Sequence, residues 1–131
     1  MAMRDDASRT ESTAPPSDDR RRNDRYEVTW AVDCVTDETF LYASITNISE
    51  MGIFVKTLEP LPIGTRLLLS FSPPGYESFK LAGMVAWQNR LKLQADNPNP
   101  GMGVRFMDLA LQDRERLVEV IRTIAYLRGS N

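Results

Sequence analysis

The stretch YEVTWAVDCV, residues 26–35, decides the class of fold. Apolar or aromatic side chains occupy every second position, and most positions between them are polar. The alternating residues are Tyr26, Val28, Trp30, Val32 and Cys34. Successive side chains of a β-strand point to opposite faces of a sheet, so a period of two is typical of a half-buried strand. The stretch therefore predicts a strand with one face in a core.

Five segments further along the chain also have the composition of short strands. They are rich in β-branched and aromatic residues, and turn-forming residues separate them. The segments are TFLYASITNI (39–48), GIFVKT (52–57), TRLLLSFS (65–72), FKLAGMVAW (79–87) and MGVRFMDL (102–109). Six short strands in succession indicate an antiparallel barrel or sandwich. We assign the aromatic residues Trp30, Phe40, Phe54, Phe71 and Phe106 to packing, and Arg105 to a strand surface.

The apolar period changes near the C-terminus. In LQDRERLVEVIRTIAYL, residues 111–127, apolar side chains recur at spacings of three and four, and charged side chains take other faces. The apolar positions are Leu117, Val120, Ile121, Ile124 and Leu127. This pattern predicts an amphipathic helix that packs on the sheet or the barrel mouth, and Gly129 is placed to end it. We therefore expect an all-β domain with a C-terminal helix.

The composition narrows the possible functions. A chain of 131 residues with 42% hydrophobic and 26% charged residues has the size and balance of one globular domain. Its formal net charge of -2 argues against a surface that coats DNA or RNA. Since it has no histidine and a single cysteine, Cys34, the common catalytic triads and zinc ligand sets are missing. We therefore expect no enzyme, no metal site and no cofactor.

The N-terminal part of the chain differs from the rest. Residues 1–19 are rich in Ser, Thr, Pro, Ala and Asp, and contain too few large apolar side chains to form a core. We expect a disordered acidic tail over residues 1–19 and one folded domain over residues 20–131. No stretch resembles a signal peptide or a membrane span, which predicts a cytoplasmic protein that does not insert into a membrane.

Two short polar motifs remain to be explained. RRRNDR, residues 20–25, concentrates four arginines where the acidic tail stops; alone, it is typical of a solvated charged run. The sequence NISEMG, residues 47–52, combines an amide, a hydroxyl and a glycine that could contact a polar ligand. The same residue types also satisfy the backbone of ordinary turns.

Together, the two motifs resemble those of the PilZ domain, the bacterial receptor for cyclic di-GMP. The family's pattern is R-x-x-x-R followed about twenty residues later by D/N-x-S-x-x-G, and the matching residues here are Arg21, Arg25, Asn47, Ser49 and Gly52. The resemblance covers about residues 20–127, including GMVAW and GMGVRF. It implies a six-stranded antiparallel β-barrel with the arginine segment ahead of the first strand.

The resemblance also implies roles for individual residues. Arg21 and Arg25 would bind the guanine and phosphate groups of cyclic di-GMP, and Arg20 and Arg22 are possible helpers. The residues that would line the barrel side of the site are Asn47, Ser49 and Gly52. Trp87 is a further candidate, as a stacking face for guanine, although a Trp on an alternating strand is more often a core residue.

The function implied is a cyclic di-GMP receptor that reorders its N-terminal arginine arm and signals to an unidentified downstream protein. The outputs that the resemblance suggests are motility, surface polysaccharide and biofilm control. The alternative is a ligand-independent PilZ-like adaptor for motility or polarity machinery. Asp24 favours this alternative modestly, because its carboxylate could pair with Arg25 or repel a phosphate.

Overall fold

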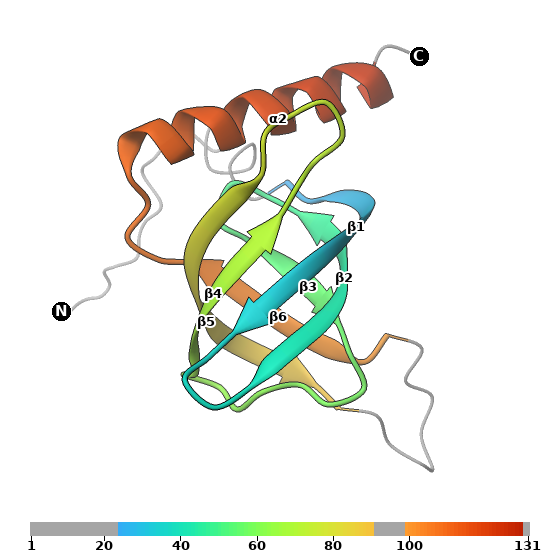
Figure 1. The fold of residues 1–131 in the computed structure, drawn as a ribbon. Helices are drawn as coiled ribbons and strands as arrows, with labels where there is room; N and C mark the ends of the chain where they lie inside the picture. The colour runs from blue at the N-terminus through green and yellow to red at the C-terminus, as the bar shows by residue number, and fades with distance from the viewer. Residues whose placement is uncertain (1–23, 91–98, 130–131) are drawn as a thin grey trace, which may run out of the picture.

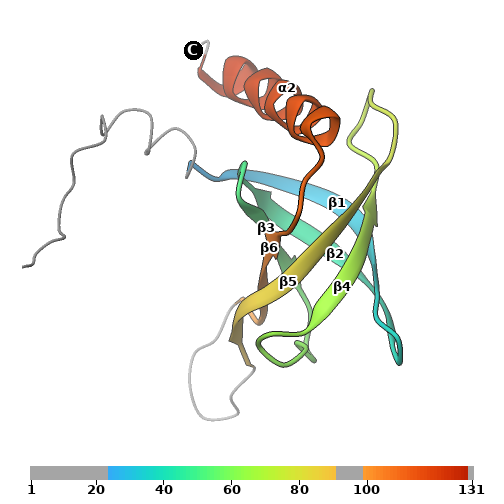
Figure 2. The same cartoon turned by 90° about the vertical axis from the view of Figure 1, so that its left-hand side faces the viewer.

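The computed structural model describes residues 24–90 and 99–129. Six strands are followed by one helix: β1 (Tyr26–Val35), β2 (Phe40–Ile48), β3 (Gly52–Lys56), β4 (Arg66–Phe71), β5 (Phe79–Asn89), β6 (Gly101–Phe106) and α2 (Leu111–Gly129). The strands form a closed barrel in the order β1-β2-β3-β6-β5-β4. In Figures 1 and 2, α2 lies across one end of this barrel and the β1–β2 hairpin is at the other end. The predicted six-stranded barrel with a C-terminal helix is confirmed; the tail predicted over residues 1–19 lies outside the described residues.

All six strand pairings are antiparallel. β2 pairs with β1 on one side and β3 on the other, and β6 lies between β3 and β5. The barrel closes where β1 meets β4, through the registered pairs of Asp33–Val35 with Leu68–Ser70. The start of β1, the end of β2 and the start of β3 consequently lie at the end of the barrel that α2 covers.

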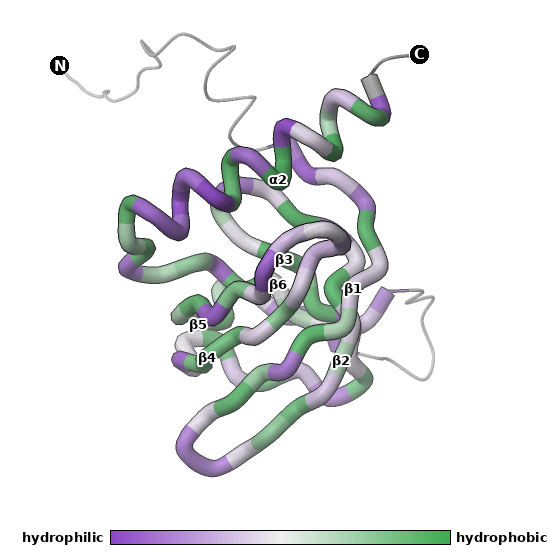
Figure 3. Tube along the Cα trace, turned by 45° about the horizontal axis from the view of Figure 1, so that its top comes forward, coloured by the Kyte–Doolittle hydropathy of each residue, from purple (hydrophilic) through white to green (hydrophobic). Residues whose placement is uncertain are grey.

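The alternation predicted from residues 26–35 places side chains inside the barrel. Val32 and Cys34 are buried, and Figure 3 shows hydrophilic and hydrophobic residues mixed along the strands. The helix closes the core with three buried side chains, Leu117, Val120 and Ile121. Full burial of one such aliphatic side chain contributes about 1.5 to 3 kcal/mol. Leu127, by contrast, is 67% exposed, so the inward stripe of the helix ends before it.

Aromatic side chains pack both inside and outside the barrel. Phe71 stacks on Trp30 and on Phe79, with ring centroids 6.2 and 5.3 Å away respectively. The packing role predicted for Phe40 is wrong, because this residue is 64% exposed. Phe40 is the first residue of β2 and pairs with the exposed Val35 of β1. Both side chains lie on the outer face. Phe54 is buried as predicted, but it does not join the inner cluster and instead contacts Trp87.

A β-bulge turns Trp87 out of the core. The β5–β6 register shifts between Val85 and Trp87, so an extra residue, Ala86, enters β5 at that point. A bulge interrupts the strict alternation of a strand. Positions 79, 81, 83 and 85 are buried, whereas Ala86 and Trp87 are both exposed. The core position that alternation favoured for Trp87 is therefore wrong, and the indole is 49% exposed on the outer face.

The buried thiol of Cys34 gives a first prediction. Burial, reinforced by the neighbouring Asp33 carboxylate, raises the pKa of Cys34 from 9.0 to about 12. Since the thiolate is the reactive form, native Cys34 at pH 8 should react with iodoacetamide on the order of 1,000-fold more slowly than in the urea-unfolded chain. The neutral thiol contributes fully to the stability of the fold below about pH 9, and this contribution is lost as the pH rises towards 12. Mass spectrometry of time points measures the label, and equal rates in both states would contradict the burial.

Candidate functional site

Arg25 joins the first motif to the second. It directly precedes β1, and the register of β1 with β2 pairs Tyr26 with Ile48, which brings residue 25 beside the end of β2. Its Nε–H donates a hydrogen bond to Asn47 Oδ1 at 2.6 Å, and an Nη1–H donates to Ser49 Oγ at 3.2 Å. Partial burial lowers the pKa of Arg25 from its ordinary value, but a guanidinium remains charged at neutral pH.

Ser49 anchors a tight turn between β2 and β3. Its side chain is buried, and its Oγ accepts hydrogen bonds from the Met51 N–H at 3.1 Å and from Arg25. The Ser49 N–H donates to the carbonyl of Gly52 at 2.9 Å, and the Phe106 N–H donates to the carbonyl of Met51 at 2.9 Å. These contacts tie the turn to itself and to β6, so the polar groups of the second motif form a fixed wall.

Gly52 is required by the close approach of two backbones. A Cβ at this position would lie 2.1 Å from the carbonyl oxygen of Val104, on the neighbouring strand β6. Real side chains do not tolerate that distance, and the obstacle is backbone rather than a flexible side chain. The φ angle of Gly52 is not positive, so close approach, and not a left-handed conformation, explains the glycine.

Two glycines of β6 form a shelf under aromatic rings. A Cβ at Gly103 would lie 2.1 Å from Nε1 of Trp87, and a Cβ at Gly101 would lie 2.6 Å from Cζ of Phe54. The two rings also contact each other, with centroids 5.3 Å apart and planes tilted by 31°. The Trp87 indole is thus held against Gly103 and Phe54, while nearly half of its surface stays exposed.

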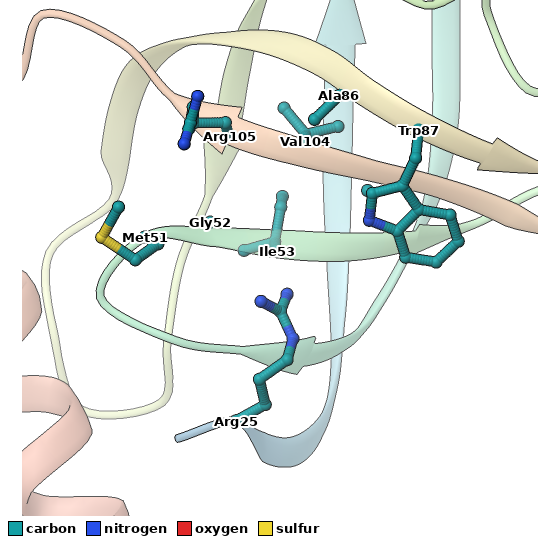
Figure 4. A pocket seen from close by; sticks show the side chains of 9 residues that line it. Arg25, Met51, Gly52, Ile53, Ala86, Trp87, Val104 and Arg105 are labelled. Carbon is teal, nitrogen blue, oxygen red and sulfur yellow. The ribbon is translucent and has the colours of Figure 1, made fainter. Parts of the chain in front are cut away.

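A small pocket lies among these groups on the outer face of the barrel. Its volume is about 110 Å³, and its lining includes Arg25, Met51, Gly52, Trp87 and Arg105. Figure 4 shows the Arg25 guanidinium pointing toward β3, with the Trp87 indole to one side and Met51 to the other. The lining contains two arginines and no carboxylate. Such a surface favours an anion that also carries a flat ring.

The structure gathers part of the predicted site. It brings together five predicted residues: Arg25, Asn47 and Ser49 by hydrogen bonds, and Gly52 and Trp87 in the pocket beside Arg25. Arg20, Arg21 and Arg22 lie outside the described residues. Within the described part of the chain, Asp24 forms no ion pair with Arg25.

Sequence reasoning missed the position of Arg105, which was assigned only to a strand surface. It is exposed on β6, as expected, but it also lines the pocket with Arg25. The signal that could have located it is the spacing of Gly101, Gly103 and Arg105, because every second residue of a strand shares one face.

Two further observations concern other site types. Over residues 24–90 and 99–129, no three His, Cys, Asp or Glu side chains gather in a way that could hold a metal ion. Within these same ranges, no helix combines the length and the apolar character needed to cross a membrane.

Comparison with known proteins connects this chain to a family. A sequence model of the PilZ domain matches residues 19–123. The solved structures with similar folds include YcgR from Escherichia coli in complex with c-di-GMP, with a TM-score of 0.69 and 14% identity over 85% of this chain and 48% of that one. The PilZ domain of the same YcgR with c-di-GMP gives a TM-score of 0.63 and 17% identity, over 86% of this chain and 98% of that one.

A third structure is the inhibitor of motility MotI/DgrA from Bacillus subtilis. Its TM-score is 0.61, with 20% identity over 76% of this chain and 48% of that one. The chain thus spans about half the length of MotI/DgrA and of the longer YcgR structure. A comparison with curated protein sequences finds no match. Because the PilZ model matches most of the sequence and the barrel has the fold of these structures, the chain belongs to the PilZ domain family.

Proposed function

We propose that this PilZ domain is a receptor for cyclic di-GMP. The observation that carries the proposal is the contact of Arg25 with Asn47 and Ser49, which joins the two polar motifs of the family into one site. Support comes from the similar structures of YcgR, which contain c-di-GMP. The proposed ligand-binding residues are those of the sequence analysis. They are Arg21, Arg25, Asn47, Ser49 and Gly52, with Arg20, Arg22 and Trp87 as further candidates.

The chemistry of the ligand suits the chemistry of the pocket. Cyclic di-GMP has two negatively charged phosphates and two purine rings, so it needs cations and flat apolar surfaces. The pocket lining supplies two guanidinium groups without an opposing carboxylate, and one indole held by its neighbours. Arginine takes phosphate oxygens in bidentate geometry, and a base stacked on an aromatic side chain contributes about 1 to 3 kcal/mol.

Arg25 also offers a mechanism for signalling. In the structure its guanidinium donates hydrogen bonds to two neutral acceptors, the amide of Asn47 and the hydroxyl of Ser49. Hydrogen bonds to a charged phosphate are stronger than hydrogen bonds to neutral acceptors, so bound ligand would draw the arginine segment toward itself. We propose that an unidentified downstream protein in the cytoplasm senses this rearrangement. Control of motility is the output that the likeness to MotI/DgrA supports best.

The test is a calorimetric titration of the full chain with cyclic di-GMP, alongside the Ser49→Ala variant. We expect one saturable binding event for the wild type and about tenfold weaker binding for the variant. Alanine removes one of the two acceptors that position Arg25 and leaves the Met51 N–H without its partner, and each lost contact to a charged or buried group costs about 1 to 3 kcal/mol.

Removal of residues 1–19 is the control, because it deletes the predicted tail and keeps every proposed site residue. Its affinity for cyclic di-GMP should stay within about twofold of the wild type. No heat from the wild type at high micromolar ligand would reject the receptor and favour the ligand-independent adaptor.

A further inference from the structure

The pocket contains an arginine for which neither motif accounts. Arg105 projects from β6 two residues after Gly103, and within residues 24–90 and 99–129 its side chain forms no hydrogen bond and no ion pair. By contrast, Arg116 contacts Asp113, the carbonyl of Glu77 and the ring of Phe79. A guanidinium at a pocket that lacks carboxylates is available to a ligand.

The register of the barrel places Arg105 beside the last residue of the second motif. Its cross-strand neighbour on β3 is Gly52, and its neighbour on β5 is Met84. The β3 and β6 backbones approach closely at Gly52, and both Gly52 and Arg105 line the pocket that Arg25 also lines (Figure 4).

The shelf sets the distance between Arg105 and the exposed indole. Trp87 lies over Gly103, and Arg105 is the next residue of β6 on the same outer face. Two residues along a strand correspond to about 7 Å. A purine stacked on the indole would therefore present its edge, rather than its face, toward Arg105. The edge of guanine carries two acceptors, O6 and N7, which match the donors of one guanidinium.

We propose that Arg105 is a specificity-determining residue that reads the O6 and N7 edge of one guanine stacked on Trp87. The proposal rests on the proposed function and adds a division of labour to it. Arg25 binds a phosphate, and the β5–β6 face recognises a base.

The experiment combines a protein variant with an altered ligand. The full chain and its Arg105→Gln variant are each titrated with cyclic di-GMP and with its 7-deaza analogue, in which a C–H replaces N7 of each base. We expect the wild type to bind the analogue about tenfold more weakly than cyclic di-GMP. The variant should bind both ligands alike, about tenfold more weakly than the wild type binds cyclic di-GMP.

The matched control is Arg66→Gln, which removes the same charge from the outer face of β4. Arg66 neighbours Met84 from one side as Arg105 does from the other, but it does not line the pocket. It should keep the wild-type preference between the two ligands.

The other outcomes separate the two proposals. If Arg105→Gln weakens both ligands by the same factor, the arginine contacts a phosphate or acts through its charge alone, and the base-reading role is wrong. An affinity within twofold of the wild type would also overturn it, while the receptor function would stand. If the wild type binds neither ligand, the receptor function itself fails, and the role of Arg105 fails with it.

Discussion

Replacing Arg25 with alanine is expected to weaken cyclic di-GMP binding by about 100-fold or more. Arg25 donates hydrogen bonds to Asn47 and Ser49 of the second motif, and it also lines the pocket. A hydrogen bond to a charged group is worth about 1.5 to 3 kcal/mol, and a guanidinium offers two of them to a phosphate. Calorimetry or ligand-detected anisotropy measures the loss.

Two further variants serve as comparisons for Arg25→Ala. Arg25→Lys keeps the charge but not the planar pair of donors, so its affinity should fall between those of the wild type and the alanine variant. Arg114→Ala removes an arginine from α2 that is outside the pocket and should change little. The thermal midpoint of Arg25→Ala should stay within a few degrees of the wild type, because the residue precedes β1 and contributes nothing to the core. Unchanged affinity would remove Arg25 from the site.

Replacing Gly52 with alanine is expected to destabilise the domain by about 3 kcal/mol. The added methyl group would lie 2.1 Å from the carbonyl oxygen of Val104, and β3 and β6 must separate to admit it. Overpacking of this kind typically costs about 1 to 3 kcal/mol, and a backbone obstacle belongs at the upper end of that range. Urea denaturation followed by circular dichroism measures the loss as a lower midpoint.

Gly83→Ala is the matched comparison for this substitution. There the closest atom to an added Cβ is a side-chain methyl of Val104, at 2.6 Å, and a side chain can move where a carbonyl of a paired strand cannot. Gly83→Ala should therefore cost less than Gly52→Ala. If the order were reversed, the spacing of β3 and β6 would not be what requires the glycine of the second motif.

The strands could be predicted from the sequence because one physical signal, alternation, runs through them. The side chains of Val32 and Cys34 are inside the barrel where that signal places them. The signal does not reveal a bulge, because an extra residue changes the outward or inward direction of every later side chain without altering composition. Trp87 was misplaced for this reason, and the inserted Ala86 is visible only in the pairing of β5 with β6.

The site could be predicted only where a motif marked it. Asn47, Ser49 and Gly52 lie close together around the β2–β3 turn, and their spacing identified them before the contacts of Asn47 and Ser49 with Arg25 were known. Arg105 has no motif of its own. Its place depends on which strand pairs with β3, and that pairing joins segments about fifty residues apart. Local sequence patterns do not report such long-range pairings.

The short seam of the barrel has a consequence for its motions. Three registered pairs, at Asp33–Val35, join β1 to β4, and the registered partners of Tyr26–Val32 lie on β2. Peeling this first part of β1 away would break the ladder with one neighbouring strand, while the seam at Asp33–Val35 stays closed. In hydrogen–deuterium exchange, the amides of this part of β1 should therefore exchange through a partial opening of the barrel. The free energy of that opening should be lower than the free energy of complete unfolding. Arg25 directly precedes this part of β1, so an event at the arginine acts on a strand segment whose registered partners lie on one neighbouring strand.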